Sequence, residues 1–226
     1  MNLSYEIEIK SLLGTKEIAD ALRARLLEAY PQMRLSSKSK QLNHYFTGGN
    51  LHDLAESITP PRLTPEKWGQ LNNLAEHAQA FSVRTREKNN DVYLVVKASI
   101  DDATSENGTS RIELEERIDV PLNELDSLLL VSGFNYQAKW SREREEYSHG
   151  GITVCLDKNA GYGWIAEFEK MIDNIDETRA AQEELRSMMS NLGVYELPQE
   201  QLSRMFTYYN EHWEEYYGTD KTFAVQ

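Results

Sequence analysis

Apolar and charged residues alternate along several short segments of the chain, a period of two that is typical of β-strands. The segment from Tyr5 to Lys10 is the first, with Tyr5, Ile7 and Ile9 alternating with charged residues. Strand character recurs over residues 41–46, 81–87, 92–100, 111–120, 138–147, 152–157 and 163–171. Turn residues at 88–91 and 149–151 join neighbouring segments and predict two hairpins. We therefore expect about eight strands.

Apolar residues at helical spacing predict helices between these strands and after the last one. Thr64 is a suitable N-cap before Pro65 at the first helical position, and Pro31 ends the first helix. The predicted helices cover residues 16–30, 51–58, 65–77, 121–131, 177–192 and 198–216. Strands and helices do not alternate regularly, so the order indicates an antiparallel α+β fold. We expect a single domain over residues 1–217 and a C-terminal tail over residues 218–226.

Charged residues two positions apart occupy one face of each of five predicted strands. An antiparallel sheet with one face in water shows the same alternation, and for any single strand that interpretation is preferred. Here, however, Arg and Glu recur with almost no neutral residue between them. The sets are Glu6, Glu8 and Lys10; Arg84 and Arg86; Arg111, Glu113, Glu115 and Arg117; Arg142 and Arg144; and Glu167 and Glu169. The pattern predicts a closed antiparallel eight-stranded β-barrel with charges inside and helices packed outside.

A charged interior of this kind needs ligands, because buried charges are costly unless they are paired or bind ions. Arginine binds phosphate oxygens through two parallel hydrogen bonds, and clustered carboxylates hold hard divalent cations such as Mg²⁺. Both kinds of side chain are present in nearly equal number in the predicted interior. The combination predicts a site for a polyphosphate together with a divalent metal ion.

Seven short segments, in this order along the chain, resemble the motifs of one protein family. They are Glu6-Ile7-Glu8-Ile9-Lys10, Val83-Arg84-Thr85-Arg86, Val96-Lys97, Arg111-Ile112-Glu113-Leu114-Glu115, Arg142-Glu143-Arg144 with Tyr147, Leu156-Asp157 and Glu167-Phe168-Glu169. The family is the CYTH, or triphosphate tunnel metalloenzyme, superfamily, which includes class IV adenylate cyclases, thiamine triphosphatases and inorganic tripolyphosphatases. The resemblance implies an eight-stranded tunnel, triphosphate substrates and dependence on Mg²⁺ or Mn²⁺.

The resemblance also implies a role for each matching residue. The expected metal ligands are Glu6, Glu8, Glu113, Glu115, Asp157, Glu167 and Glu169, although Glu113 and Glu115 could instead hold the arginines in place. The expected phosphate-binding residues are Lys10, Arg84, Arg86, Lys97, Arg111, Arg142 and Arg144. Tyr45 or Lys97 is the expected proton-handling group. One departure is Asn43, which stands where many members of the family carry Asp.

Three functions are compatible with these residues. The first is a metal-dependent hydrolase of inorganic tripolyphosphate or an organic triphosphate. The second is a class IV adenylate cyclase that forms cyclic AMP from ATP, and the third is a non-catalytic protein that binds polyphosphate or nucleotides. The sequence contains no recognisable adenine pocket and lacks the His-Phe element that precedes the first motif in some cyclases. The hydrolase is therefore preferred.

The composition limits the kinds of molecule that this protein is expected to bind. With 24 basic and 37 acidic residues, the formal net charge is −13, which argues against binding to nucleic acid or to an anionic membrane. The expected ligand is a small anionic triphosphate. Cys155 is the single cysteine, so no intramolecular disulfide forms, and we interpret it as a buried filler in a reducing compartment. The absence of a long apolar run predicts a cytoplasmic protein. We expect this protein to be a monomer or a homodimer.

Overall fold

The computed structural model describes residues 5–60, 62–99 and 112–224, which contain eight strands and six α-helices. The strands are β1 (Tyr5–Gly14), β2 (Arg34–Gly48), β3 (Ala80–Lys88), β4 (Asp91–Ser99), β5 (Ile112–Arg117), β6 (Phe134–His149), β7 (Ile152–Asn159) and β8 (Gly163–Ile172). The helices are α1 (Lys16–Ala29), α2 (Leu51–Ser57), α3 (Pro65–His77), α4 (Leu122–Val131), α5 (Thr178–Asn191) and α6 (Gln199–Tyr216), with a short 3₁₀ helix, η2 (Ile175–Glu177). The predicted elements are all present.

The eight strands form one antiparallel sheet in the order β1-β8-β7-β6-β2-β3-β4-β5. Within the described residues, no pairing joins β1 to β5, the two end strands of this order. The predicted closed barrel is therefore wrong, and the sheet is open. Alternation reveals which side chains share a face of a strand, but closure also requires hydrogen bonds between the first and last strands. The local pattern carries no information about that pairing.

The chain forms two compact units, one made of residues 1–40 and 141–226 and the other of residues 41–140. Strands β2 and β6 belong to both, because each changes unit partway along its length. These two strands are also longer than the alternation predicts. Apart from Leu35, residues 34–40 are polar, so a pattern of apolar residues could not reveal that β2 begins at Arg34.

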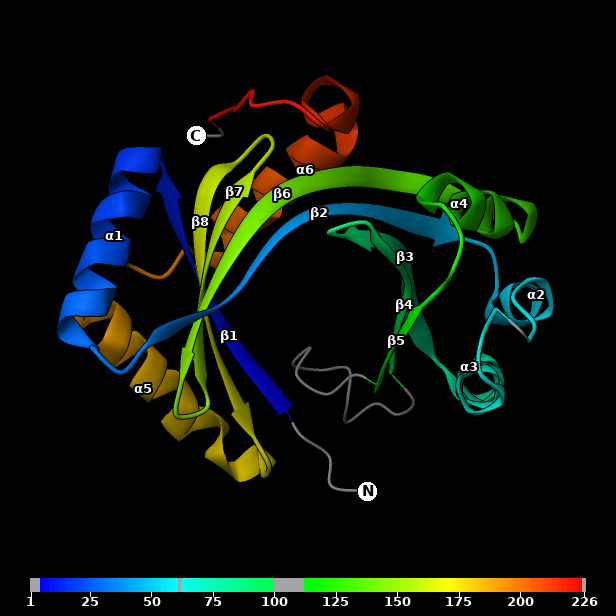
Figure 1. The fold of residues 1–226 in the computed structure, drawn as a ribbon, viewed down its shortest axis with the longest axis horizontal. Coiled ribbons are helices and arrows are strands. Elements are labelled where there is room, and N and C mark those ends of the chain that lie inside the picture. Colours follow the sequence, from blue (N-terminus) through cyan, green and yellow to red (C-terminus); the bar gives the residue numbers. More distant parts are fainter. Residues whose placement is uncertain (1–4, 61, 100–111, 225–226) are drawn as a thin grey trace. The chain divides into compact units, whose positions relative to one another are not determined.

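In the first unit, α1 and α5 cover the apolar face of β1, β7 and β8 (Figure 1). Ile7 and Ile9 of β1 pack with Leu22 of α1 and Leu185 of α5 in one hydrophobic core. The neighbouring residues of β1 point to the opposite face of the sheet because side chains alternate along a strand. The helices therefore decide which face of β1, β7 and β8 remains for the charged residues.

In the second unit, α2, α3 and α4 cover the apolar side of β3, β4 and β5 (Figure 1). Val83, Leu94 and Leu114, one from each strand, are almost fully buried against these helices. Thr64 caps α3 as predicted, since its side chain accepts a hydrogen bond from the backbone N–H of Lys67. Each unit has its own hydrophobic core, and in each the face opposite that core carries the charged residues.

The end of the described chain packs beside the β7–β8 turn of the first unit. The backbone N–H of Gly161 donates to the carbonyl of Lys221, and the N–H of Phe223 donates to the carbonyl of Gly161. Phe223 lies among the rings of Tyr162, Tyr209 and other aromatic residues. The aromatic residues of α6 thus form packing contacts.

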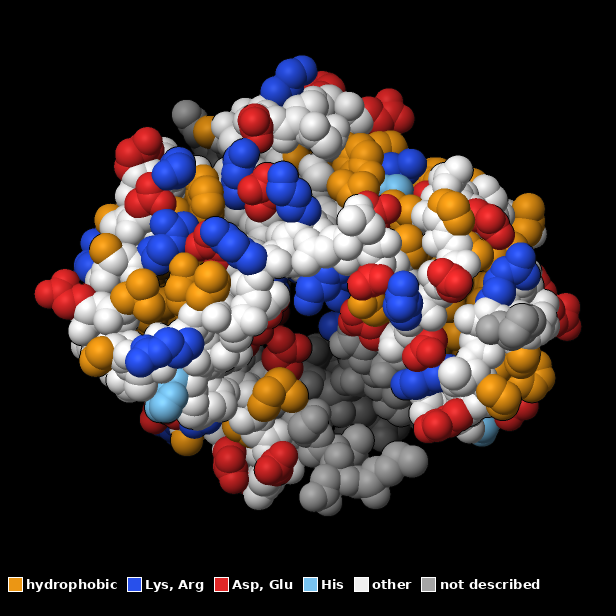
Figure 2. Space-filling view, viewed as in Figure 1, with side chains coloured by type: hydrophobic (Ala, Val, Ile, Leu, Met, Phe, Trp, Pro, Cys, Tyr) orange, Lys and Arg blue, Asp and Glu red, His pale blue; other side chains and the backbone are white. Residues whose placement is uncertain are grey.

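Among the described residues, no helix combines the length and the apolar character needed to cross a bilayer. Basic and acidic side chains are interspersed over the face shown in Figure 2.

Gly163 provides a test of the packing between β1 and β8. Its φ is +74°, and a Cβ added there would lie 2.3 Å from the backbone oxygen of Gly14. Gly151 has a similar φ of +80° but open space around the same position. We predict that Gly163→Ala lowers the free energy of unfolding by roughly 3 kcal/mol or more, against about 1 kcal/mol for Gly151→Ala. Denaturant unfolding followed by circular dichroism measures both, and equal losses would contradict the predicted clash.

Candidate functional site

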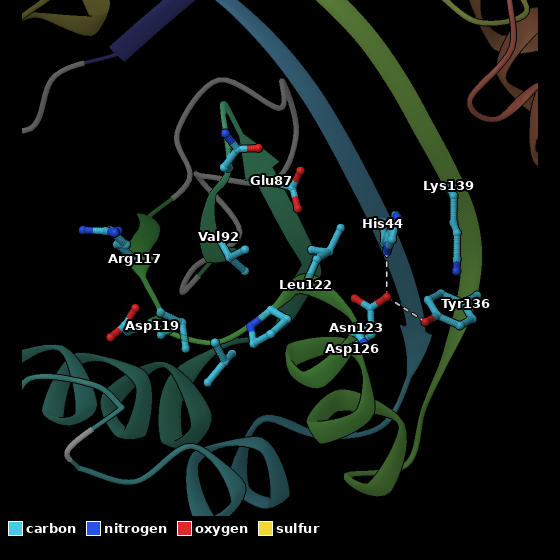
Figure 3. A pocket seen from close by; sticks show the side chains of 14 residues that line it. His44, Glu87, Val92, Arg117, Asp119, Leu122, Asn123, Asp126, Tyr136 and Lys139 are labelled. Carbon is cyan, nitrogen blue, oxygen red and sulfur yellow. Dashed lines mark hydrogen bonds and ion pairs between the residues drawn. The ribbon is translucent and has the colours of Figure 1, made fainter.

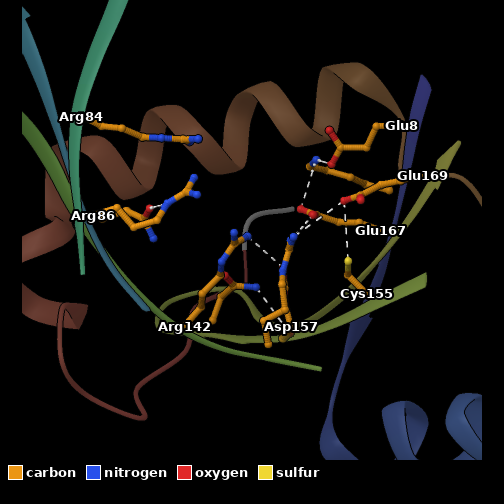
Figure 4. Close-up of polar contacts among 12 residues, drawn as sticks. Glu8, Arg84, Arg86, Arg142, Cys155, Asp157, Glu167 and Glu169 are labelled. Atoms are coloured by element: carbon orange, nitrogen blue, oxygen red, sulfur yellow. Dashed lines mark hydrogen bonds and ion pairs between the residues drawn. The ribbon is translucent and has the colours of Figure 1, made fainter. Parts of the chain in front are cut away.

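The charged face of the first unit brings acidic and basic side chains from four strands together (Figure 4). Antiparallel pairing places Lys10 of β1 opposite Glu167 of β8, and Arg144 of β6 opposite Asp157 of β7. We call this group the carboxylate–arginine cluster. It consists of Glu8, Lys10, Arg142, Arg144, Cys155, Asp157, Glu167 and Glu169.

Asp157 holds the two arginines of the cluster. Its side chain is 1% exposed, and it accepts hydrogen bonds from Arg144 Nε at 2.7 Å and from Arg144 Nη2 at 2.6 Å. Arg142 Nη1 donates to the same carboxylate at 3.0 Å. Burial would lower the pKa of Arg144, but its contacts with Asp157 and Glu167 outweigh that effect and raise the pKa. Both guanidinium groups are therefore fixed in orientation, and Arg144 is firmly charged.

Glu167 is the ionised carboxylate at the centre of the cluster. Arg144 donates a hydrogen bond to it, and Lys10 Nζ lies 3.2 Å from its Oε1. Burial alone would raise the pKa of Glu167, yet the positive charges of Lys10, Arg144 and Arg142 hold it well below its usual range. Lys10 also bonds Glu8 at the exposed edge of the cluster. Glu167 consequently carries a full negative charge at any physiological pH.

Glu169 has the opposite electrostatic balance. Burial raises its pKa to about 7, helped by the negative charges of Glu167 and Glu6 and opposed by Arg144. The nearest Arg144 nitrogen is 3.7 Å from Glu169 Oε1, too far to compensate fully. Because its pKa lies near neutral pH, a cation that approached Glu169 would favour the ionised carboxylate and lower this pKa.

Cys155 lies beside this carboxyl group, with its Sγ 3.7 Å from Glu169 Oε1. One ligand atom from each of Cys155, Glu167 and Glu169 falls within 4.8 Å of the other two. Burial raises the pKa of the Cys155 thiol, so the thiol is neutral. The two carboxylates of this group fit a divalent cation, and the neutral thiol lies beside them.

The second unit carries a separate group of charged side chains on β2, β3 and β5. Arg84 Nη1 donates to the hydroxyl of Tyr45 at 2.9 Å, and the guanidinium lies 5.5 Å from the centre of the Tyr45 ring. Arg86 Nε donates to Asn43 Oδ1 at 3.0 Å, and its Nη1 bonds both oxygens of Glu115. Asn43 therefore orients an arginine without adding a negative charge. Glu115 holds the same arginine, which is one of the two roles considered for it.

The remaining predicted residues differ in how much the structure describes. Glu6 is exposed on β1, and Lys97 is half-buried on β4, opposite Glu113 in the strand register. The side chain of Glu113 and the whole of Arg111 lie outside the described residues. Within each unit, the predicted residues that are described lie on the strand face that the alternation predicts.

Two polar features of the structure differ in how far the sequence indicates them. Cys155 is buried, as the filler interpretation predicts, and it also shares the parity of Asp157 and lies opposite Glu167 in the strand register. Asp126 of α4 was not singled out at all, although it is 3% exposed and bonds His44. Nothing in the spacing of residues 44 and 126 indicates this second feature.

Comparison with solved structures identifies proteins with a similar fold. The PH1819 protein from Pyrococcus horikoshii OT3 aligns with a TM-score of 0.57 at 22% identity over 86% of this chain and 94% of its own. A candidate adenylate cyclase from Vibrio parahaemolyticus aligns with 0.57 at 15%, over 90% and 98%. The Hippeastrum protein HpAC1, an adenylyl cyclase candidate described with a dominant triphosphatase activity, aligns with 0.51 at 15%, over 89% and 95%. At these identities the likeness concerns the fold.

Sequence comparison gives the family. No curated protein matches this sequence. The model of the CYTH domain, however, matches residues 63–201, a stretch that includes the arginines of β3 and β6 and the carboxylates of β7 and β8. Since the match covers more than half of the 226 residues, this chain belongs to the CYTH family.

Proposed function

We propose that this protein is a metal-dependent hydrolase of triphosphates. The observation that carries the proposal is the electrostatic arrangement around Arg144. Buried Asp157 fixes this guanidinium from one side, and the Glu167–Glu169–Cys155 donor set lies beside it. Groups that bind phosphate oxygens and groups that bind cations are thus adjacent within one unit. CYTH proteins include triphosphatases and cyclases that require a metal ion.

Glu167 and Glu169 would hold the divalent cation, with Glu6 and Glu8 of β1 as further carboxylate ligands. Mg²⁺ and Mn²⁺ suit this set because both prefer carboxylate oxygens. When bound, such an ion neutralises phosphate charge and activates a water molecule for attack on phosphorus. In this proposal Asp157 is an orienting group, because its oxygens are already engaged by Arg142 and Arg144.

The basic residues of the chain would bind the phosphate oxygens. Arg142 and Arg144 present guanidinium groups whose direction is set by Asp157, so little side-chain entropy is lost on binding. Arg84, Arg86 and Lys97 of the second unit are proposed for the same kind of contact. Tyr45 is proposed to handle a proton, and its hydrogen bond from Arg84 Nη1 orients the hydroxyl.

We expect phosphate release from inorganic tripolyphosphate with Mg²⁺ or Mn²⁺, and its loss when a chelator removes the metal. Glu169→Gln should lower kcat by about 100-fold or more, because it removes an anionic ligand while keeping the volume. Glu196→Gln, which changes an exposed carboxylate paired with Arg186, should leave turnover unaltered. If cyclic AMP and pyrophosphate accumulated from ATP faster than phosphate was released from tripolyphosphate, the proposed hydrolase function would be wrong. The cyclase function would then replace it.

Glu169→Gln should raise the free energy of unfolding, although it should lower kcat. Glu169 has a folded pKa of about 7, above its ordinary 4.5, so its ionisation above pH 7 costs stability. Without metal at pH 8, Glu169→Gln should unfold with a free energy roughly 1–3 kcal/mol higher than the wild type. This difference in the free energy of unfolding should disappear as the pH falls towards 4.5, the ordinary pKa of the Glu169 carboxyl group. Urea titrations at pH 8 and pH 5 with a chelator measure it, and a loss of stability at pH 8 would contradict the assigned pKa.

Arg144 should be more than a positive charge. Lysine in its place keeps the charge but loses the two parallel bonds to Asp157, so Arg144→Lys should raise KM for tripolyphosphate by about tenfold or more. Arg179→Lys alters an exposed arginine paired with Glu183 and serves as the control. Steady-state kinetics at saturating metal compare the two, and unchanged KM in Arg144→Lys would remove this residue from the phosphate-binding set.

A further inference from the structure

A buried polar network lies on the helix-covered face of the second unit (Figure 3). Asp126 of α4 is its centre, and three strands donate hydrogen bonds to it. His44 Nδ1 of β2 lies 2.7 Å from Oδ2, Tyr136 OH of β6 is also 2.7 Å from Oδ2, and Thr85 Oγ1 of β3 is 2.6 Å from Oδ1. One carboxylate thus joins a helix to three strands.

The carboxylate is ionised although it is buried. Burial would raise the pKa of Asp126, but the hydrogen bonds from His44, Thr85 and Tyr136 outweigh it, and the pKa is lowered. His44 and Thr85 are themselves buried. Such a network is costly, since apolar residues of similar volume would fill the space without a desolvation penalty. What it adds is a defined geometry, because hydrogen bonds are directional and hydrophobic contacts are not.

The geometry that it defines belongs to the strands carrying the phosphate-binding candidates. His44 and Thr85 are direct partners in the β2–β3 register. Their neighbours in sequence point to the opposite face of the sheet. There the next register pairs are Tyr45 with Arg84 and Asn43 with Arg86.

Both of these flanking pairs are joined by side-chain hydrogen bonds, at 2.9 Å from Arg84 to Tyr45 and 3.0 Å from Arg86 to Asn43. The same backbone segments, residues 43–45 and 84–86, therefore carry a network on each face. If the contact with Asp126 changes and this backbone moves, Arg84 and Arg86 on the opposite face of the sheet move with it.

We propose that Asp126 is a positioning residue for Arg84 and Arg86. By binding His44 and Thr85 it holds residues 43–45 against residues 84–86, and this sets where the two guanidinium groups are presented. The inference rests on the proposed function, in which these arginines bind phosphate oxygens. Ligand-binding groups need support from a second layer of contacts to stay within a fraction of an ångström of their working positions.

The kinetic test compares Asp126→Asn with Leu125→Ala. The first keeps the volume and removes the charge, whereas the second removes packing from the neighbouring residue of the same helix, which is fully buried in the apolar core. Asp126→Asn should raise KM for tripolyphosphate by about tenfold with kcat changed less than about twofold, because binding contacts made equally in the ground and transition states affect KM. Leu125→Ala should lower the melting temperature at least as much and leave KM unaltered. Equal KM changes in the two variants would overturn the proposal.

A spectroscopic test separates this inference from the proposed function. The side-chain Nε–H signals of Arg84 and Arg86 in a ¹⁵N-correlated spectrum can be assigned by their loss in Arg84→Lys and Arg86→Lys. Asp126→Asn should shift or broaden both signals and leave that of Arg144 in place, while Leu125→Ala should move neither. Thr85→Val, which removes one of the three hydrogen bonds, is the milder variant if Asp126→Asn does not fold.

The two failures are distinguishable. A wild-type protein that does not hydrolyse tripolyphosphate removes the proposed function, while the arginine signals still test the role of Asp126. Unaltered arginine signals in Asp126→Asn, in an enzyme that is active, remove the positioning role alone.

Discussion

Each strand of this sheet must satisfy two environments at once, because successive side chains point to opposite faces. In β1, Ile7 and Ile9 enter the core beneath α1 and α5, and the residues between them carry charge. In β3, Val83 is buried against helices while Arg84 is presented on the other side. A slip of one residue in register would bury the charges and expose the core. The packing of the cores and the placement of the charged residues therefore depend on the same strand register.

The charged face is stable only because most of its charges are compensated locally. Asp157 and Arg144 neutralise each other through two short hydrogen bonds, and Glu167 is surrounded by cations. Glu169 is less well compensated, which is why burial raises its pKa to about 7. The carboxyl group that is least satisfied by the protein thus lies next to Arg144. The proposed function rests on that combination and not on the number of charges.

Membership of the CYTH family and the chemistry of the reaction are decided by different features. The sequence match over residues 63–201 shows the family. The solved structures with a similar fold include a cyclase candidate and a protein described with a dominant triphosphatase activity. A hydrolase and a cyclase of triphosphates differ in which phosphorus is attacked and by which oxygen. Fold alone does not separate them.

The sequence by itself determined the local features of this protein: the strands and helices, the face of each strand that is charged, and the family. The elements and the charged faces follow from the spacing of neighbouring residues, and the family follows from the sequence match over residues 63–201. The tertiary structure decided which strand edges pair, so the closed barrel expected from alternation is an open sheet with β1 and β5 as its end strands. It also decided that Asp157 holds two arginines, that Cys155 approaches Glu169 and that Asp126 joins three strands. These contacts join residues of different strands and helices, and hydrogen-bond geometry between separate elements leaves no periodic trace in the sequence.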